Sequence, residues 1–308
     1  MIITITPNPS IDVSYYMEEF QLDAVNRCYD YNKTAGGKGL NVSKVLKIIG
    51  EDLLATGFAG GKSGEFIEEG LKERNIKSRF IKIAGETRTS LAIQHEDTST
   101  EIREAGPTIS TEEEQEFLDL LKDLAEKADT FCISGSLPLG LDYSFMEKVL
   151  DITKDKKLIV DTSGENLHKI VFESTIKPYA VKPNLDEIME LTGLKKEELK
   201  IEEILKGDVF KDIPLVMVSL GKEGAVAKYK DSLYRMTVPV IEAVNSVGSG
   251  DSTIAGLAYG ISHQLEIKET FKLAMSFGVL NALEKEIGYI NINHLEDMKE
   301  KIKVEEII

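Results

Sequence analysis

The chain has 308 residues, of which 42% are hydrophobic, so it can form one large α/β domain or two smaller ones with a sizeable core. Its 37 basic and 53 acidic residues give a net charge of -16 at pH 7, which argues against general binding to nucleic acid or to anionic membranes. Any phosphate-binding site must therefore depend on a local group of residues, because the chain as a whole is negatively charged.

The N-terminal segment, residues 1–7, has no basic stretch before an apolar one, and no apolar run in the sequence approaches the length of a membrane span. Cys28 and Cys132 are far apart and have no partners at metal-ligand spacing. The four histidines are scattered. We therefore expect a cytoplasmic protein with neither a disulfide framework nor a dedicated metal cage.

Two segments, 12–34 and 87–104, alternate polar and apolar residues without an intervening helix, which is typical of antiparallel strands. Their expected apolar face consists of Val13, Tyr15, Tyr29, Tyr31, Leu91 and Ile93. We expect a small β lid that forms a two-fold dimer through this face, although the face could instead pack on the parent domain. The expected core is then 1–11, 35–86 and 105–308.

Residues 33–42 form a glycine-rich loop that opens a helix. Gly36 and Gly37 permit close backbone approach, and Lys38 and Asn41 could meet hydroxyl groups or a phosphate. The spacing is neither that of a P-loop nor that of a dinucleotide-binding fingerprint. Taken alone, the loop is better explained as a turn with a surface lysine.

In the central part of the chain, short apolar runs alternate with amphipathic helical patterns, which predicts a mostly parallel sheet with helices on both faces. Strands are predicted at 130–134, 157–161, 179–182 and 215–220, and helices at 143–151, 185–192 and, as a solvated helix, 195–203. Polar or glycine residues follow these strands at 134–136, 161–164, 183–184 and 219–221. This edge is where open α/β sheets bind ligands.

Residues 245–251 form a second glycine-rich loop, which runs into a helical pattern. Gly248 and Gly250 let backbone N–H groups turn toward an anion, and the start of the helix adds partial positive charge. Asp251 is placed to accept the proton of an attacking hydroxyl group. A capped helix without function explains this short stretch equally well.

A series of motifs in order resembles the ribokinase-like carbohydrate kinases, specifically the phosphofructokinase-B group. These motifs are at 6–12, 36–42, 85–89, 134–138, 182–187, 218–221 and 248–251. The resemblance runs from end to end. It implies a three-layer α/β/α sandwich with a mostly parallel central sheet and a small β lid, and it implies ATP and Mg²⁺ as cofactors.

The resemblance also implies roles for individual residues. Asp251 would be the catalytic base, beside an anion hole made by Gly248, Ser249 and Gly250. The substrate would contact Asp12, Arg27, Gly36, Gly37, Lys38, Asn41, Arg88 and Ser136, with the two arginines on its phosphate unless they are ordinary surface charges. The nucleotide would contact Lys182, Asn184, Glu187, Ser219, Gly221, Ser246, Val247 and Asn281. Glu187 would organise the magnesium, through water.

Asn245-Ser246 stands where many members carry Asp-Thr, which disfavours a simple-sugar substrate. The implied reaction is ATP-dependent phosphorylation of a ketohexose phosphate. The first expected substrate is D-tagatose 6-phosphate, phosphorylated at O1. Fructose 1-phosphate is the alternative substrate, and a non-catalytic sugar-phosphate sensor is a remote alternative. A dinucleotide-dependent oxidoreductase is disfavoured because the glycine fingerprint is absent. The expected partners are a sugar phosphate, MgATP and a second copy of the chain.

Overall fold

In the computed structural model, which describes residues 1–95 and 98–307, ten strands form a central sheet in the order β14-β13-β12-β11-β10-β9-β8-β1-β4-β5. The strands from β11 to β5 are parallel, and β12, β13 and β14 add antiparallel neighbours at one edge. Their bounds are β1 Ile2–Thr6, β4 Leu53–Ala59, β5 Lys77–Lys82, β8 Thr130–Ser134, β9 Lys157–Asp161, β10 Ala180–Val181, β11 Leu215–Ser219, β12 Ala225–Tyr229, β13 Ser232–Thr237 and β14 Lys303–Glu306.

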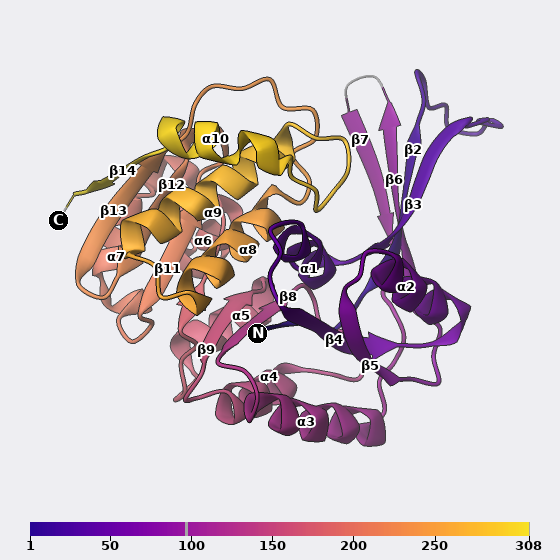
Figure 1. Ribbon diagram of the computed structural model, residues 1–308, viewed down its shortest axis with the longest axis horizontal. Coiled ribbons are helices and arrows are strands. Elements are labelled where there is room, and N and C mark those ends of the chain that lie inside the picture. Colours follow the sequence, from indigo (N-terminus) through magenta and orange to yellow (C-terminus); the bar gives the residue numbers. More distant parts are fainter. Residues whose placement is uncertain (96–97, 308) are drawn as a thin grey trace.

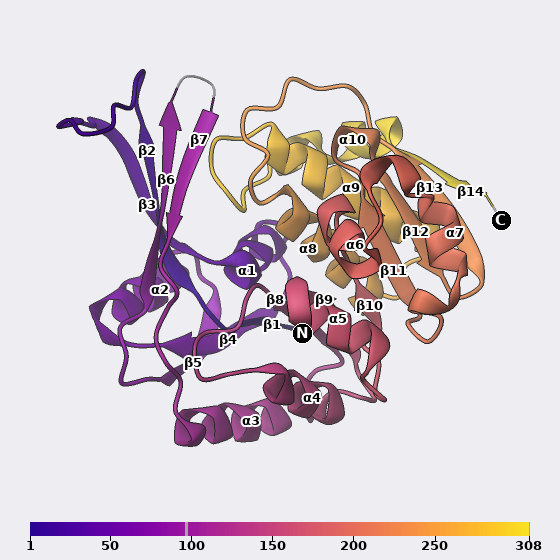
Figure 2. The same ribbon diagram turned by 180° about the vertical axis from the view of Figure 1, so that it is seen from behind.

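Helices cover both faces of the central sheet (Figures 1 and 2). One layer contains α1 Lys38–Ile48, α2 Gly61–Glu73, α8 Ser249–Ser262, α9 Ile267–Ala282 and α10 Leu295–Lys301. The other contains α3 Thr111–Ala125, α4 Tyr143–Ile152, α5 Gly164–Phe172, α6 Leu185–Thr192 and α7 Ile201–Lys206. Short 3₁₀ turns lie at Lys196–Glu198, Asp208–Phe210, Gly221–Glu223 and Ile292–His294. The predicted α/β/α sandwich is confirmed.

Strand β1 illustrates why the central strands are apolar on both sides. All five of its residues are buried, because it lies between β4 and β8 and has helices on both faces. Ile2 belongs to the hydrophobic cluster under α1 and α8, whereas Ile3 and Ile5 belong to the cluster under α3 and α4. Strand periodicity thus distributes one short segment over two cores.

A four-stranded sheet in the order β3-β2-β6-β7 projects from the central sheet, and we call it the lid sheet (Figure 1). It consists of β2 Ser10–Tyr16, β3 Asp30–Gly36, β6 Arg88–His95 and β7 Thr98–Arg103. Strands β2 and β3 extend two residues beyond the predicted segment 12–34. Residues 96–97 of the predicted segment 87–104, together with residue 308, lie outside the described residues.

The expectation that the lid strands are all antiparallel is wrong for the central pair, β2 and β6, which is parallel. Only the pairs β2–β3 and β6–β7 among the described residues of this sheet are antiparallel. The reason is topological. Strands β2 and β6 continue from β1 and β5, which belong to the same parallel set and therefore leave the central sheet at the same edge and in the same direction.

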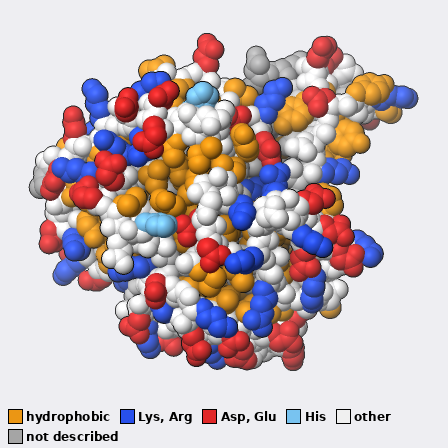
Figure 3. All heavy atoms as spheres, viewed as in Figure 1, with side chains coloured by type: hydrophobic (Ala, Val, Ile, Leu, Met, Phe, Trp, Pro, Cys, Tyr) orange, Lys and Arg blue, Asp and Glu red, His pale blue; other side chains and the backbone are white. Residues whose placement is uncertain are grey.

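The two faces of the lid sheet differ in character. Register places Val13, Leu91 and Ile102 side by side on one face, and Asp12 and Ser90 side by side on the other. Val13 is buried within the single chain, as is Ile93, whereas the side chains nearer the free end and edges are exposed: Tyr29 88%, Tyr31 57% and Ile102 54%. Figure 3 shows hydrophobic side chains at the outer end of this sheet.

Four predicted elements differ from the observed ones, and the helix expected at 143–151 ends one residue later, at Ile152. The strand expected at 179–182 is shorter, Ala180–Val181, and the one expected at 215–220 ends at Ser219. The single solvated helix expected at 195–203 is wrong, because a 3₁₀ turn ends at Glu198 and α7 begins at Ile201. Leu199 adopts an extended backbone, which lets α7 bury Ile201 and Leu205 instead of remaining fully solvated.

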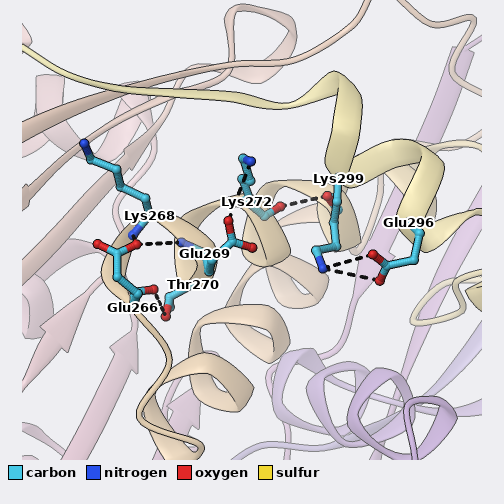
Figure 4. A network of polar contacts seen from close by, with 8 residues as sticks. Glu266, Lys268, Glu269, Thr270, Lys272, Glu296 and Lys299 are labelled. Carbon is cyan, nitrogen blue, oxygen red and sulfur yellow. Dashed lines mark hydrogen bonds and ion pairs between the residues drawn. The ribbon is translucent and has the colours of Figure 1, made fainter.

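The exposed surface of α9 and α10 carries a network of caps and ion pairs (Figure 4). Glu266 accepts hydrogen bonds from the backbone N–H groups of Lys268 and Glu269, which satisfies donors at the start of α9. Lys299 pairs with Glu296 one turn earlier on α10. Exposed pairs of this kind contribute little to stability. Within residues 1–95 and 98–307, every helix is too short or too polar to cross a lipid bilayer.

Candidate active site

A cleft of about 610 Å³ lies where the carboxyl ends of the parallel strands face the lid sheet. Four central strands contribute their last residues to it: Thr6, Ser134, Asp161 and Ser219. Side chains of β2, β6 and β7 form the opposite wall. A second hollow beside residues 243–245 has a volume of about 710 Å³ but does not contain the charged cluster described next. The predicted ligand edge of the sheet is thus the floor of the first cleft.

Asp251 lies in the first turn of α8 and is only 6% exposed. Its Oδ2 accepts a hydrogen bond from Asn41 Nδ2 at 2.8 Å. Burial and the nearby Asp161 raise the pKa of Asp251 to about 7, while the Asn41 hydrogen bond and the charges of Lys38 and Lys182 oppose this shift. A carboxyl group with a pKa near neutrality can both accept and release a proton.

The glycine loop before Asp251 keeps the start of α8 open toward the cleft. Gly248 has a φ of +84°, and a Cβ there would lie 2.7 Å from Ile287 Cγ2, so only glycine fits. A Cβ on Gly250 would lie 3.4 Å from Lys182 Nζ. The N–H groups of Gly250 and Asp251 have no intrahelical acceptors, whereas that of Ser249 donates to the Ser246 backbone oxygen at 3.3 Å. Free N–H groups at a helix start, together with the helix dipole, can bind an anion.

Asp161 is the buried centre of a charge cluster that faces Asp251, in which Lys182 is buried and the Lys38 side chain is 44% exposed. Its Oδ2 lies 3.3 Å from Lys38 Nζ, and its Oδ1 lies 3.5 Å from Lys182 Nζ. Burial alone would raise the pKa of Asp161, but Lys182 and Lys38 outweigh it and hold that pKa below its ordinary value. Asp161 therefore stays charged and orients both lysines toward the cleft.

Asn184 and Glu187 cap the start of α6 reciprocally. Asn184 Oδ1 accepts from the Glu187 backbone N–H, and Glu187 Oε2 accepts from the Asn184 backbone N–H, both at 2.9 Å. Burial raises the pKa of Glu187, the hydrogen bond from Asn184 lowers it, and Asp161 raises it further. The capping box thus holds a carboxyl group at the wall of the cleft.

The lid sheet contributes a carboxylate and a guanidinium group. Asp12 lies against Gly36, where a Cβ would be 2.0 Å from Asp12 Cγ, and it accepts a 2.6 Å hydrogen bond from Ser10 Oγ. Arg88 donates to the backbone oxygens of Asn8 and Glu104, at 3.1 and 3.0 Å. Both Asp12 and Arg88 line the cleft. The position of Asp12 depends on the absence of a side chain at residue 36.

The cleft brings most of the predicted site residues together. Those that line it are Asp12, Gly37, Lys38, Asn41, Arg88, Ser136, Lys182, Asn184, Glu187, Ser219, Val247, Gly248, Gly250 and Asp251. Gly36 and Ser249 directly adjoin lining residues in the chain. The remaining ones, Arg27, Gly221, Ser246 and Asn281, are not part of this lining.

Two of those four positions have a clear structural explanation. Arg27 is exposed on the connection between β2 and β3, outside the cleft of its own chain. Asn281 is fully buried, donates to the Val247 backbone oxygen, and accepts from Ser252 Oγ and the Gly288 backbone N–H. Because its side-chain atoms are engaged within the protein, Asn281 is placed to support the glycine loop rather than to contact nucleotide.

Asp161 is the functional candidate that sequence reasoning did not single out. The signal was present, since residues 161–164 were placed at the ligand edge of the sheet. Strand position alone does not show that Lys38, 123 residues earlier, and Lys182, just after the next strand, converge on this carboxylate. Thr6, Asn8 and Ser134 were missed as well, and each has a buried side-chain oxygen without a partner among the described residues.

The donor set fits magnesium carried by a nucleotide. Among the described residues, no group of three or more His, Cys, Asp or Glu side chains could hold a metal ion by itself. Magnesium bound through phosphates keeps several waters and needs only one or two protein carboxylates. Asp161 and Glu187 line the same cleft as the start of α8, and they are the carboxylates that would meet this need.

Comparison with known proteins agrees with this site. The family described as pfkB family carbohydrate kinase matches residues 5–292. The chain belongs to this family. Two tagatose-6-phosphate kinases from Staphylococcus epidermidis strains are each 43% identical to this pfkB chain over 311 aligned residues, and the match covers 100% of both proteins. The resemblance that the motifs indicate is therefore confirmed.

Solved structures of pfkB-like architecture superimpose on the whole chain. A structure described as a possible 1-phosphofructokinase from Thermotoga maritima is 25% identical, with a TM-score of 0.88 over 100% of this chain and 99% of the other. Phosphofructokinase-2 from Escherichia coli, in complex with potassium, is 21% identical, with a TM-score of 0.87 over 97% and 98%. The latter similarity shows that the fold is shared.

Proposed function

We propose that the chain is an ATP-dependent kinase that phosphorylates D-tagatose 6-phosphate at O1 to give the 1,6-bisphosphate. Membership of a carbohydrate kinase family and 43% identity to tagatose-6-phosphate kinases over the full length support this substrate. The observation that carries the mechanism is the position of Asp251, a buried carboxyl group at the open start of α8.

In the proposed reaction, the oxygen of the sugar hydroxyl bonds to the γ-phosphorus of ATP while Asp251 accepts the proton of that hydroxyl. The bond between that phosphorus and the bridging oxygen breaks, and ADP leaves with the electron pair. The N–H groups of Gly248, Gly250 and Asp251 stabilise the charge on the transferred phosphoryl group, whereas that of Ser249 donates to the Ser246 backbone oxygen at 3.3 Å. Magnesium bound with the nucleotide supplies further positive charge. Alignment and electrostatics then account for most of the rate enhancement.

On the sugar side, we assign Asp12 to the hydroxyl groups and Arg88 to the phosphate already present on the substrate. Asp12 is an acceptor held in place by Ser10 and Gly36, and Arg88 presents a planar donor group that suits a phosphate. The other predicted sugar contacts are Gly37, Lys38, Asn41 and Ser136, all of which line the same cleft. Arg27, exposed on the connection between β2 and β3, stays a prediction.

On the nucleotide side, we assign Lys182 and Ser219 to phosphate contacts and Glu187 to magnesium, through water. Lys182 lies beside the glycine loop, and Glu187 is held at the cleft wall by its capping box. The buried Ser249 hydroxyl, which has no hydrogen-bond partner among residues 1–95 and 98–307, provides an additional donor or acceptor within the loop. ATP and Mg²⁺ are therefore the cofactors of this proposal.

Fructose 1-phosphate is the second candidate substrate. The full-length structural similarity to a possible 1-phosphofructokinase, at 25% identity, favours it. The mechanism would be the same, because only the position of the existing phosphate and one epimeric centre differ. A coupled assay of ADP release that compares kcat/KM for tagatose 6-phosphate, fructose 6-phosphate, fructose 1-phosphate and unphosphorylated sugars separates these candidates. Without ADP release from any sugar, the sensor alternative replaces the kinase.

Replacement of the base tests the mechanism. We expect Asp251→Asn to lower kcat by roughly 10³-fold or more, with little change in KM for the sugar phosphate, because the amide cannot accept the proton. In the unaltered enzyme, kcat should rise as the pH increases through about 7, where Asp251 loses its proton. Asp123→Asn, on the exposed surface of α3, is the matched control. Full turnover in Asp251→Asn would eliminate this base.

We also propose that two chains associate through the exposed face of their lid sheets, as the predicted dimer requires. The exposed Tyr29, Tyr31 and Ile102 are the side chains that such an interface would cover. The cytoplasm is the proposed compartment, in agreement with the free thiols of Cys28 and Cys132.

A further inference from the structure

Lys44, on α1, is a buried charged residue that has no part in the mechanism described above. It is 2% exposed, and it forms no ion pair with any carboxylate of residues 1–95 and 98–307. Burial lowers the pKa of Lys44 to about 8; Asp12 raises it, Arg74 lowers it, and Glu286 and Asp251 raise it. Burial of an ammonium group is unfavourable unless its donors are satisfied, so the hydrogen-bond acceptor of Lys44 indicates why this charge is kept inside the protein.

Two hydrogen bonds connect Lys44 to Asp251. Lys44 Nζ donates to Asn41 Oδ1 at 3.2 Å, and Asn41 Nδ2 donates to Asp251 Oδ2 at 2.8 Å. Because an ammonium group can only donate, it selects one of the two orientations of the Asn41 amide, with the oxygen toward Lys44 and the nitrogen toward Asp251. Lys44 and Asn41 are three residues apart on α1, so they share one face of that helix.

The loop that follows α9 closes over this pair. A Cβ on Gly288 would lie 3.0 Å from Asn41 Cα and 3.1 Å from Lys44 Cδ, so the backbone there is in direct contact with both residues. Asn41 is 5% exposed. Although Asn41 lines the cleft, its amide has few alternative partners at this low exposure, and the Lys44 ammonium group favours the orientation in which the amide oxygen faces it.

We propose that Lys44 is a positioning residue, which holds the Asn41 amide with its nitrogen toward Asp251 and leaves Asp251 Oδ1 for the sugar hydroxyl. The inference rests on the proposed function, in which Asp251 accepts the proton. Without Lys44 the amide can rotate. Its oxygen would then face the Asp251 carboxylate, repel it and favour the protonated acid, which cannot act as a base.

Lys44→Met tests this role, because methionine has a similar length without a donor or a charge. We expect kcat to fall about tenfold or more while KM for tagatose 6-phosphate and for MgATP changes less than about twofold. The acid limb of the kcat–pH profile should move to higher pH. Asp161, Lys38 and Lys182, which also face Asp251, are unchanged in the variant. Lys47→Met, on the same helix, is the matched control.

A cycle with Asn41→Ala identifies the route of the effect. If Lys44 acts through Asn41, adding Lys44→Met to Asn41→Ala should change kcat by less than about twofold. If Lys44→Met does not fold, Lys44→Gln takes its place in the experiment, because glutamine keeps a neutral donor. Lys44→Gln should retain more turnover at high pH than at low pH. A lower melting temperature with unchanged kcat and unchanged acid limb would overturn the proposal.

The same experiment separates the inference from its foundation. If Asp251→Asn is inactive while Lys44→Met has the kcat and pH profile of the unaltered enzyme, the role of Lys44 is refuted and the role of Asp251 as base stands. An active Asp251→Asn removes the base itself, and with it the role of Lys44. Fully additive losses in the Asn41 cycle would also overturn the proposed connection.

Discussion

At the scale of single residues, Asp251, the proposed base, is held in its site at the expense of stability. Its carboxyl group is buried beside the charged Asp161, and its pKa of about 7 lies well above the ordinary value of 3.8. Lys38, Lys182 and Asn41 offset this effect only in part. A group that must be deprotonated to act is therefore held where deprotonation is unfavourable, as in other sites that tune a carboxyl group for proton transfer.

This cost predicts a pH-dependent gain in stability for Asp251→Asn. Since the folded pKa is raised, the folded chain binds more protons than the unfolded chain between about pH 4 and 7, and the free energy of unfolding falls as pH rises through that window. The amide introduced by the substitution would carry no charge and could still accept from Asn41. We expect the melting temperature of the variant to exceed that of the unaltered protein by a few degrees at pH 8 and by much less at pH 5.

Calorimetry at the two pH values checks this expectation, with Asp123→Asn as the control for charge removal at an exposed site. An equal difference at pH 5 and pH 8 would show that ionisation of Asp251 is not the cause. A loss of stability at both values would instead indicate that the introduced amide cannot accept the hydrogen bond that Asn41 donates to Asp251.

At the scale of elements, the capping box of α6 serves both the helix and the cleft. Asn184→Ala removes the acceptor of the Glu187 backbone N–H and should lower the free energy of unfolding by about 1 kcal/mol. It should also raise KM for MgATP, because Glu187 loses part of the structure that orients it toward the cleft. Ser110→Ala, in the capping box of α3 with Glu113, is the matched control.

Urea unfolding and MgATP titration of the two variants distinguish the two roles of the α6 cap. Ser110→Ala should reduce stability by a similar amount and leave KM for MgATP unchanged, because α3 contributes no residue to the cleft lining. If both variants changed KM equally, the effect would come from general destabilisation, and the placement of Glu187 by its cap would be refuted.

Elements were predictable from the sequence where one local signal dominates. The apolar run 130–134 and the helix 185–192, ended by Gly193 with a φ of +70°, needed no tertiary information. The parallel pairing of β2 with β6 depends on where β1 and β5 leave the central sheet, which no local pattern contains. The Asp161 cluster and the Lys44–Asn41–Asp251 chain likewise join segments up to 210 residues apart.

At the scale of the molecule, the cleft exists only because two sheets meet. The central sheet and the helices α1 and α8 supply Asp251, the proposed base, and the glycine loop, whereas the lid sheet supplies Asp12 and Arg88. Apart from Val13, the lid-sheet residues that line the cleft belong to the polar face, so most of the apolar face is turned away from the cleft. Anything that sets the position of the lid sheet therefore also sets the distance of Asp12 and Arg88 from Asp251, and in the proposed reaction the distance between the sugar and the base.

Association through the apolar face of the lid sheet is consequently expected to matter for activity. Ile102→Asp places a charge on an exposed β7 position that pairs with Leu91 on the same face. We expect sedimentation velocity to show a dimer for the unaltered protein at micromolar concentration and a monomer for the variant, because an unpaired carboxylate is costly in an apolar interface. KM for the sugar phosphate should rise as the lid sheet loses its support.

Leu139→Asp, which alters an equally exposed leucine of the core domain, should stay dimeric with unchanged KM. A monomeric unaltered protein with full activity would show instead that the lid sheet positions Asp12 and Arg88 without a second copy.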